Sequence, residues 1–183
     1  MTDTKTQSLR YLDSARLRLV AATSELVGQD LQGQSELASV IEAEVPPNWP
    51  PDLYDRPAMQ YAARQLADPG QTGWSFWYMI DRLSEPPVVI GICGFKGRPD
   101  AQGRVEIGYS VLSQFRNQGF ASEATARLVS WAFGHGRVRE VSAETLPHLV
   151  PSIRVLEKNG FALRGKGSER GVVRYVICRD QLN

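Results

Sequence analysis

The chain has few of the residues that build metal centres or disulfide frameworks. Its 183 residues include two cysteines and two histidines, and the sequence holds no Cys-x-x-Cys pair. Cys93 and Cys178 both lie in apolar runs, which is typical of buried thiols rather than of a disulfide or a metal pair. We therefore expect no metal cofactor.

Long hydrophobic runs and a strong charge bias are also missing. The longest apolar run, around 88–95, is too short to span a bilayer. The first ten residues are polar and of mixed charge, unlike a signal peptide. A formal net charge of +1 gives no surplus for a polyanion. These absences predict a cytoplasmic protein with neither a membrane nor a nucleic acid as partner.

Two common phosphate-binding motifs are absent as well. A Rossmann fold needs a glycine fingerprint after its first strand, with an acidic residue about twenty positions later. A P-loop needs Gly-Lys-Ser/Thr. Because the sequence contains neither motif, nucleotide hydrolysis and dinucleotide-dependent reduction are both disfavoured.

The length suits a single domain, 1–183, with a core at about 15–180 and a flexible segment at 1–14. Apolar periodicity predicts strands at 16–22, 74–80, 86–96, 103–112, 138–145, 161–166 and 172–179, and helices at 34–44, 55–67, 121–133 and 152–159. Three consecutive strands imply antiparallel pairing, and a later strand–helix–strand unit implies a parallel pair. We therefore expect an α+β fold with a mixed, mostly antiparallel central sheet and helices on both faces.

The most informative segment is 105–125. Alternating apolar residues from Val105 to Val111 predict a strand, and the turn Arg116-Asn-Gln-Gly119-Phe-Ala121 leads directly into a helical pattern. The first N–H groups of a helix have no intrahelical partner and lie at the positive end of its dipole, so they bind phosphate. The segment predicts a cofactor that carries a pyrophosphate. The alternative is an ordinary turn in which Gly119 serves only its φ angle.

This turn resembles the acetyl-CoA signature of the GNAT superfamily of N-acetyltransferases. The segment from Ser152 to Phe161 looks like the S-x-x-x-x-x-K-x-G-F ending of the superfamily, in particular of the branch that includes the ribosomal-protein N-terminal (alanine/serine) acetyltransferases. The strand Val105-Glu-Ile-Gly-Tyr109 matches the same branch. The resemblance covers nearly the whole chain and implies the acyl-CoA N-acyltransferase fold.

The resemblance also implies a set of residues that hold acetyl-CoA. It assigns the pyrophosphate to the main chain of the turn, with added charge from Arg116. It assigns the thioester and pantetheine arm to a gap beside the preceding strand, where a backbone N–H near Val111 stabilises the oxyanion. The implied cofactor residues are Tyr109, Ser110, Val111, Arg116, Asn117, Gln118, Gly119, Phe120, Ala121 and Ser122.

Glu106 is the first candidate for the base that takes the proton of the amine. A carboxylate in the middle of an alternating strand is costly to bury, so a function or a partner is expected. A glutamate near this position often serves as base in the family. The alternatives are a Glu106 paired with an arginine or facing solvent. Glu144 is the reserve candidate, with a structural role favoured for it.

The general acid is where the chain departs from part of the superfamily. Leu156 replaces the tyrosine that several members use, and Leu149 replaces an asparagine that holds the pantetheine arm in many relatives. Ser152 is the nearest hydroxyl, and its competing role is the N-cap of a helix. His135 is expected to cap a helix or lie at the surface, whereas His148 lies closer to the predicted pocket.

The acceptor pocket is expected at the proline-rich loop 45–54. Trp49 and Tyr54 would form its wall, or they would only cover the edge of the core. The predicted function is acetyl transfer from acetyl-CoA to a primary amine of a small molecule or a protein N-terminus. The alternative is a non-catalytic acyl-CoA-binding or sensing module on the same fold. A homodimer is left open.

Overall fold

The computed structural model describes residues 9–182, and residues 1–8 of the segment expected to be flexible lie outside this range. The strands are β1 (Tyr11–Asp13), β2 (Leu17–Ala21), β3 (Phe76–Asp81), β4 (Val88–Phe95), β5 (Arg104–Val111), β6 (Glu140–Thr145), β7 (Ala162–Lys166) and β8 (Val173–Cys178). The α-helices are α1 (Ser24–Gln32), α2 (Gln34–Ile41), α3 (Arg56–Gln65), α4 (Phe120–Gly134) and α5 (Val150–Lys158).

The strands form one eight-stranded sheet in the order β1-β2-β3-β4-β5-β6-β8-β7. Within the described residues, β5 and β6 form the parallel pair, and the remaining neighbours are antiparallel. Helix α4 connects β5 to β6, as a parallel pair requires. This topology confirms the predicted α+β class and its mixed, mostly antiparallel sheet.

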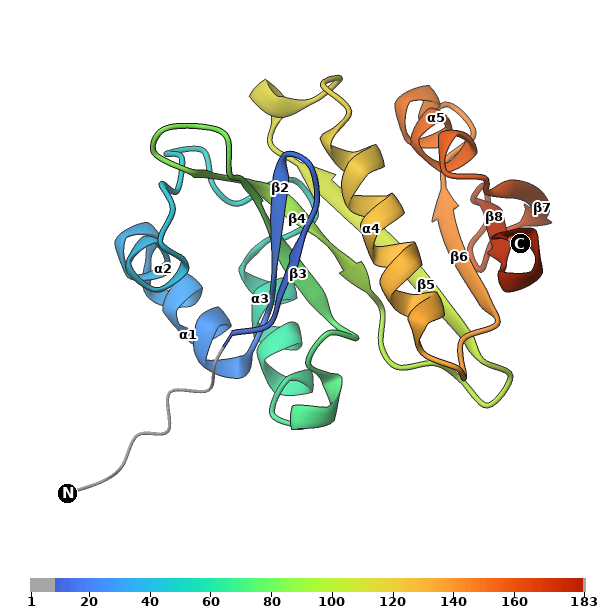
Figure 1. Cartoon of the computed structure of the whole chain (residues 1–183), viewed down its shortest axis with the longest axis horizontal. Coiled ribbons are helices and arrows are strands. Elements are labelled where there is room, and N and C mark those ends of the chain that lie inside the picture. Colours follow the sequence, from blue (N-terminus) through green and yellow to red (C-terminus); the bar gives the residue numbers. More distant parts are fainter. Residues whose placement is uncertain (1–8, 183) are drawn as a thin grey trace.

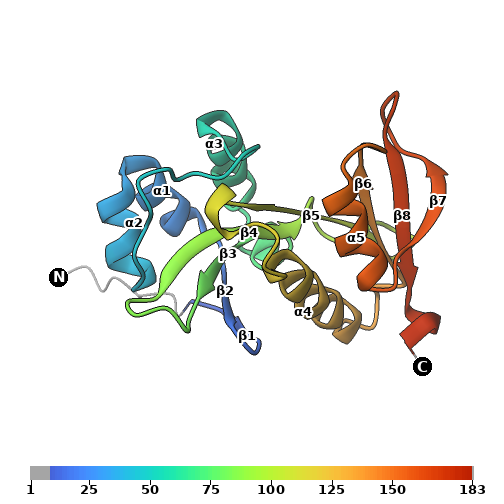
Figure 2. The ribbon, with the colours of Figure 1, turned by 90° about the horizontal axis from the view of Figure 1, so that it is seen from above.

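Helices cover both faces of the sheet, and each face has its own apolar core (Figures 1 and 2). Leu128 of α4 and Leu156 of α5 pack on one face against Leu19, Trp77 and Ile107. On the other face, residues of α1, α2 and α3 pack against alternate residues of β2 and β3. We call these the α4–α5 face and the α1–α3 face. The predicted placement of helices on both faces is confirmed.

Two elements near the amino end were not predicted. Tyr11–Asp13, within the segment expected to be flexible, form β1 because they pair antiparallel with β2. Helix α1 begins after Thr23, whose hydroxyl accepts a hydrogen bond from the Leu26 N–H at 3.1 Å. This cap was the sequence signal for α1. Its weak apolar periodicity, with Gly28 and Asp30 inside it, hid the helix.

Candidate active site

The parallel strands β5 and β6 separate partway along their length. They pair only from Arg104 to Glu106, opposite Glu140 to Ser142. Beyond this point β5 remains paired with β4 up to Val111, and β6 remains paired with β8 up to Thr145. The sheet is therefore open between residues 107–111 of β5 and residues 143–145 of β6. Figure 1 shows the two strands diverging beside α4.

The register of β5 determines which backbone groups line this opening. The Lys96 N–H donates to the Glu106 carbonyl at 2.9 Å, and the Leu112 N–H donates to the Ile90 carbonyl at 2.9 Å. Even-numbered residues of β5 therefore hydrogen-bond with β4, and odd-numbered residues direct their N–H groups to the opposite edge. At Tyr109 and Val111 that edge has no neighbouring strand. The sequence alone did not reveal this divergence.

A second set of free backbone donors lies at the start of α4. Asn117 and Gly119 adopt positive φ angles of 61° and 84°, and Gly119 is the N-cap of the helix. Within the described residues, the backbone N–H groups from Asn117 to Ser122 have no recorded acceptor. Asn117, Gln118 and Gly119 are exposed. The turn therefore offers a row of free donors at the positive end of a fifteen-residue helix.

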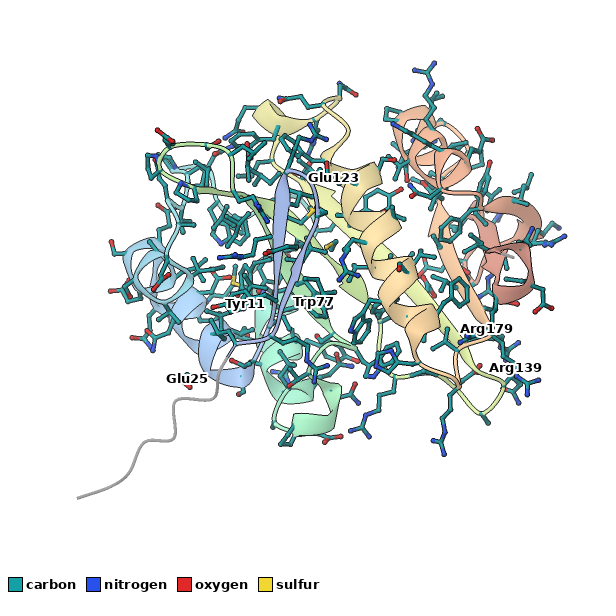
Figure 3. The ribbon with its side chains drawn as sticks, in the orientation of Figure 1. Tyr11, Glu25, Trp77, Glu123, Arg139 and Arg179 are labelled. Atoms are coloured by element: carbon teal, nitrogen blue, oxygen red, sulfur yellow. The ribbon has the colours of Figure 1, made fainter. Side chains whose placement is uncertain are left out.

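The hairpin between β1 and β2 holds this turn in place through Arg16. The Arg16 guanidinium donates to the Gln118 carbonyl at 2.9 Å and to the Glu123 carboxylate at 2.8 Å, and it lies 4.3 Å from the centre of the Phe120 ring. Figure 3 labels Glu123 on the first turn of α4, beside the hairpin. Sequence analysis missed this contact because its residues are 107 positions apart.

Glu123 is held as a carboxylate by this contact. Burial opposes ionisation, but hydrogen bonds from the Arg16 N–H, the Ser14 hydroxyl and the Arg16 guanidinium lower the pKa of Glu123 below its ordinary value. The cation of Arg16 also compensates a negative charge that would otherwise weaken anion binding at the helix start.

Arg116 contacts both the strand and the acceptor loop. Its guanidinium donates to the Val111 carbonyl at 2.8 Å and to the Asp52 carboxylate at 2.6 Å. The first contact fixes the end of β5 relative to the turn. The second links the turn to the loop that contains Trp49 and Tyr54.

Glu106 lies where β5 and β6 begin to separate, and its carboxylate forms an ion pair with Lys96. Lysine thus takes the place of the arginine partner considered from the sequence. Alternation along β5 places Glu106, Gly108 and Ser110 on the α1–α3 face, opposite Val105, Ile107 and Val111. The Glu106 side chain is 21% exposed, so it is open to a substrate on that face.

Tyr109 and Ser152 meet on the other face of the opening. The Tyr109 hydroxyl donates to the Ser152 carbonyl at 3.1 Å and lies 3.1 Å from the Ser152 hydroxyl oxygen. Burial raises the pKa of Tyr109, although its hydrogen bond with Ser152 opposes the shift, so this hydroxyl keeps its proton at neutral pH.

The N-cap interpretation of Ser152 is wrong. Helix α5 begins at Val150, two residues earlier, with Leu149 at the cap position and Pro151 in the first turn. Proline in the first turn was the available signal for this boundary. The Ser152 side chain is therefore directed to Tyr109 rather than to the helix start. Leu156 is buried in the core at 1% exposure, and Leu149 is exposed at 43%.

Trp49 and Tyr54 belong to a buried polar cluster around Asp30. The Asp30 carboxylate accepts hydrogen bonds from the Trp49 indole at 2.8 Å, from the Tyr78 hydroxyl at 2.9 Å and from the Tyr54 hydroxyl at 3.4 Å. Burial raises the pKa of Asp30, and these donors oppose the shift. The cluster attaches the proline-rich loop to α1 and β3. Both rings are largely buried, which agrees with the alternative that they cover the edge of the core.

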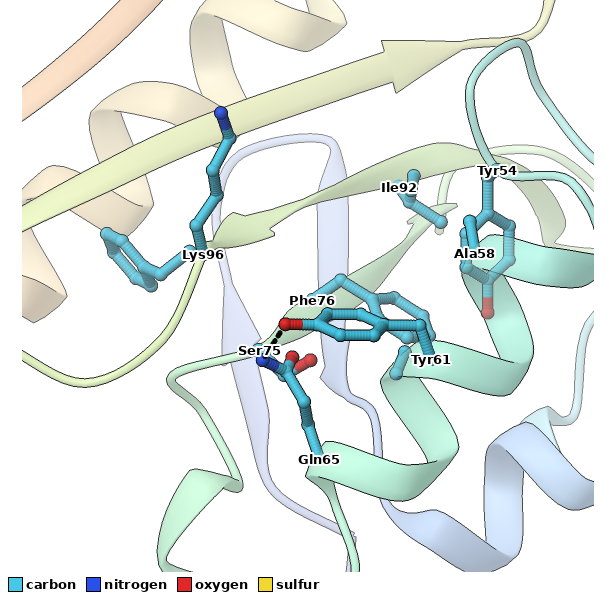
Figure 4. A pocket seen from close by; sticks show the side chains of 10 residues that line it. Tyr54, Ala58, Tyr61, Gln65, Ser75, Phe76, Ile92 and Lys96 are labelled. Carbon is cyan, nitrogen blue, oxygen red and sulfur yellow. Dashed lines mark hydrogen bonds between the residues drawn. The ribbon is translucent and has the colours of Figure 1, made fainter. Parts of the chain in front are cut away.

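A pocket of about 370 Å³ lies between α3 and the α1–α3 face of the sheet (Figure 4). Tyr54 lines it and Trp49 does not. Its walls combine rings and small apolar side chains with three polar residues: Tyr54, Ala58, Tyr61, Ala62, Gln65, Ser75, Phe76, Ile92, Phe95 and Lys96. Because Lys96 pairs with Glu106, the pocket adjoins the carboxylate proposed as base.

The reserve candidate Glu144 has structural partners. Burial opposes ionisation of Glu144, but hydrogen bonds from Ser168 and Arg174 lower its pKa. His135 is the C-cap of α4, as expected, and His148 is exposed. Among the described residues, no helix is long and apolar enough to cross a membrane, and no group of three His, Cys, Asp or Glu side chains is placed to hold a metal.

Comparison with known proteins agrees with this geometry. Residues 16–162 match the model of the acetyltransferase (GNAT) domain family. The uncharacterized N-acetyltransferase YjdG of Bacillus subtilis is 28% identical over 162 residues, which cover 86% of this chain and 93% of YjdG.

Solved structures show the same fold at lower identity. RimL, a ribosomal L7/L12 alpha-N-protein acetyltransferase solved in complex with coenzyme A, is 19% identical and superposes with a TM-score of 0.68 over 93% of this chain and 99% of its own. The ribosomal-protein-S5-alanine acetyltransferase of Vibrio fischeri is 15% identical, with a TM-score of 0.67 over 95% and 99% of the two chains. The chain therefore belongs to the GNAT acetyltransferase domain family, and it is an acetyl-CoA-dependent acyltransferase.

Proposed function

We propose that the protein transfers the acetyl group of acetyl-CoA directly to a primary amine, of a small molecule or of a protein N-terminus, through the opening between β5 and β6. The observation that carries this proposal is the pair of backbone donor sets at Tyr109–Val111 and Asn117–Ser122. Family membership and relatives named N-acetyltransferases support catalysis over a sensing role.

The turn before α4 would hold the diphosphate. Its N–H groups provide several donors that belong to the backbone, so no side chain has to be ordered when the ligand binds. The positive φ of Gly119 lets these groups converge. Asn117, Gln118, Gly119, Phe120, Ala121 and Ser122 contribute these donors. Arg116 adds positive charge, although its contacts with Asp52 and Val111 make it chiefly a brace. The exposed apolar side chains Leu146 and Leu149, on the loop after β6, offer a surface for the pantetheine arm.

Acetyl-CoA supplies an activated carbonyl carbon, and the chain's own groups manage the protons and the charge. Glu106, on the α1–α3 face, would accept the proton of the ammonium group, directly or through water, so that the nitrogen lone pair can attack. The Val111 N–H, at the unpaired edge of β5, would donate to the carbonyl oxygen as it becomes negative. Tyr109 and Ser110 directly precede this donor in the strand.

Ser152 would donate a proton to the sulfur when the carbon–sulfur bond breaks, with its hydroxyl oriented by Tyr109. The base and the acid then lie on opposite faces of the same strand, with the oxyanion donor at the edge between them. Amine and thiol would accordingly enter and leave on different sides of the sheet. Tyr54 would contribute to the acceptor wall, and Trp49 would support it from behind through Asp30.

An acceptor screen tests this function. Purified protein is incubated with acetyl-CoA and a panel of primary amines, free thiol is measured, and calorimetry follows acetyl-CoA binding. We expect saturable binding and thiol release that depends on the amine. Binding without thiol release for any amine would instead support the sensing module. The cytoplasmic location and the possible homodimer stay predictions, checked by fractionation and by light scattering.

A further inference from the structure

A strip without side chains crosses β4 and β5 on the α1–α3 face. Gly94 of β4 pairs with Gly108 of β5, between the Ile92–Ser110 pair and the Lys96–Glu106 ion pair. Alternation places all six residues on the same face. Gly94 is itself buried, so the strip is open at Gly108, which lies between the pocket residues Ile92 and Lys96 and the open edge of β5.

The two glycines of this strip differ in what the fold requires of them. A Cβ at Gly94 would lie 2.4 Å from the Phe76 Cα and from the Ser75 carbonyl oxygen, so packing explains that glycine. A Cβ at Gly108 would meet no atom within 4 Å, and Gly108 has no positive φ. Gly108 is also exposed. Neither packing nor backbone geometry explains it, whereas a ligand lying across β5 would.

The pocket at the end of the strip is suited to an apolar group. Three of its walls are the rings of Tyr54, Tyr61 and Phe76, and a volume of about 370 Å³ is in the range of small-ligand sites. None of its ten lining residues is a carboxylate. Lys96 is its one permanent charge, and the lining offers no carboxylate to pair with a second cation on the acceptor.

We propose that the acceptor is a primary amine attached to an apolar, preferably aromatic, group. The apolar group occupies the pocket beneath α3, and the chain between it and the amine crosses the bare surface at Gly108. The amine then lies beside Glu106 and the opening between β5 and β6. This inference rests on the proposed function and names the acceptor class for it.

Two sources share this chemistry, and they are separated by the probes. A free arylalkylamine is represented by 2-phenylethylamine, with 1,4-diaminobutane as its doubly charged control. A peptide N-terminus is represented by phenylalanyl-glycine amide, with aspartyl-glycine amide as its control. Thiol release gives kcat/KM for each probe, and calorimetry gives the dissociation constant of acetyl-CoA.

The decisive variant is Gly108→Val, which places a branched side chain on the strip without a clash in the protein. Gly136→Val is the matched control, because Gly136 also has open space around its Cβ position but lies after α4, beyond the sheet. We expect kcat/KM for the preferred aromatic probe to exceed that of its control at least tenfold. Gly108→Val should lower it at least tenfold, and both variants should keep the acetyl-CoA affinity and melting temperature of the wild type.

Each outcome decides the proposal. Preference for 1,4-diaminobutane or aspartyl-glycine amide, or an unchanged kcat/KM in Gly108→Val, overturns the acceptor class while acetyl transfer stands. Activity with only one of the two aromatic probes supports the class and identifies its source. Absence of acetyl-CoA binding to the wild type would overturn the proposed function, and this inference with it.

Discussion

In the proposed function, the two faces of the sheet recognise ligands by different means. Beside α4, the donors are backbone N–H groups. The turn before α4, the first turn of α4 and the end of the pairing between β5 and β6 determine their positions. On the α1–α3 face, the recognition surface consists of side chains from α3, β3, β4 and the loop before α3. The proposed backbone site is local in sequence and tolerates side-chain change, whereas the proposed acceptor surface depends on packing among distant segments.

The largest effect is expected where the backbone itself is disturbed. Gly119→Val should weaken acetyl-CoA binding by about 1,000-fold, because misplacing two or so charge-assisted hydrogen bonds costs several kcal/mol. Gly119 has a φ angle of 84°, and Gly171, which lies between β7 and β8, has a φ angle of 86°. Gly171→Val therefore controls for backbone strain. Equal affinities of the two variants in calorimetry would break the comparison.

A side chain on the acceptor face is tested next. Glu106→Gln keeps the shape of the side chain but removes the base, so kcat should fall by about 100-fold at neutral pH with little change in acetyl-CoA affinity. Glu144→Gln, at a carboxylate held by Ser168 and Arg174, should leave kcat unchanged. An unaltered rate and pH profile in Glu106→Gln would eliminate Glu106 as base.

Arg16 shows whether the backbone site needs support from outside its own segment. Arg16→Gln should raise the KM for acetyl-CoA by about tenfold while kcat changes little, because Gln118 and Glu123 lose their shared charged donor. Arg18, two residues further along the chain in β2, pairs with Asp13 at the surface. Arg18→Gln should therefore leave the KM unchanged. A fall in kcat alone would assign Arg16 a different role.

The smallest effects concern pH, and the two faces should respond in opposite directions. The pKa of Glu123 is lowered from 4.5, so its contribution to stability is complete above 4.5 and is lost as pH falls through the folded-state pKa. The pKa of Asp30 is raised from 3.8, so its contribution is complete below 3.8 and is lost as pH rises through the folded-state pKa.

Urea unfolding of variants from pH 3 to 8 checks this contrast. Glu123→Gln should remove part of the destabilisation below pH 4.5, and Asp30→Asn should remove the decline in stability that begins above pH 3.8. If both variants remove the same part of the dependence of unfolding free energy on pH, the opposite directions of the two pKa shifts are disproved.

The same contrast explains what the sequence could reveal. Strand, glycine turn and helix start are consecutive between Val105 and Ala121, so local pattern was sufficient to predict this arrangement. The order of strands and helices along the whole chain predicted the fold class. The cluster of Asp30, Trp49, Tyr54 and Tyr78 joins three separate segments: α1, the proline-rich loop and β3. No periodicity indicates which aromatic ring turns inward to a buried carboxylate, and the burial of Trp49 followed only from the structure.

The separation of β5 from β6 was beyond local pattern for a related reason. Residues 107–111 alternate like any paired strand, and nothing in them marks the loss of a neighbour. Ser142 marks the last pairing, where its hydroxyl reaches the Val105 carbonyl at 3.3 Å. Ser152 was misjudged because a hydroxyl residue is a common N-cap, while Pro151, which marks the first turn of the helix, was not used as the boundary signal.

The short parallel ladder between β5 and β6 has a mechanical consequence. Three register pairs join a five-stranded half of the sheet to a three-stranded half, and the packing of α4 and the contact between Tyr109 and Ser152 add further connections. A cofactor bound between the two halves would accept hydrogen bonds from the unpaired backbone N–H groups of β5, as a neighbouring strand does in a complete sheet. Cofactor binding should therefore restrict motion between the two halves of the sheet. We expect it to slow amide hydrogen exchange at residues 104–106 and 140–142.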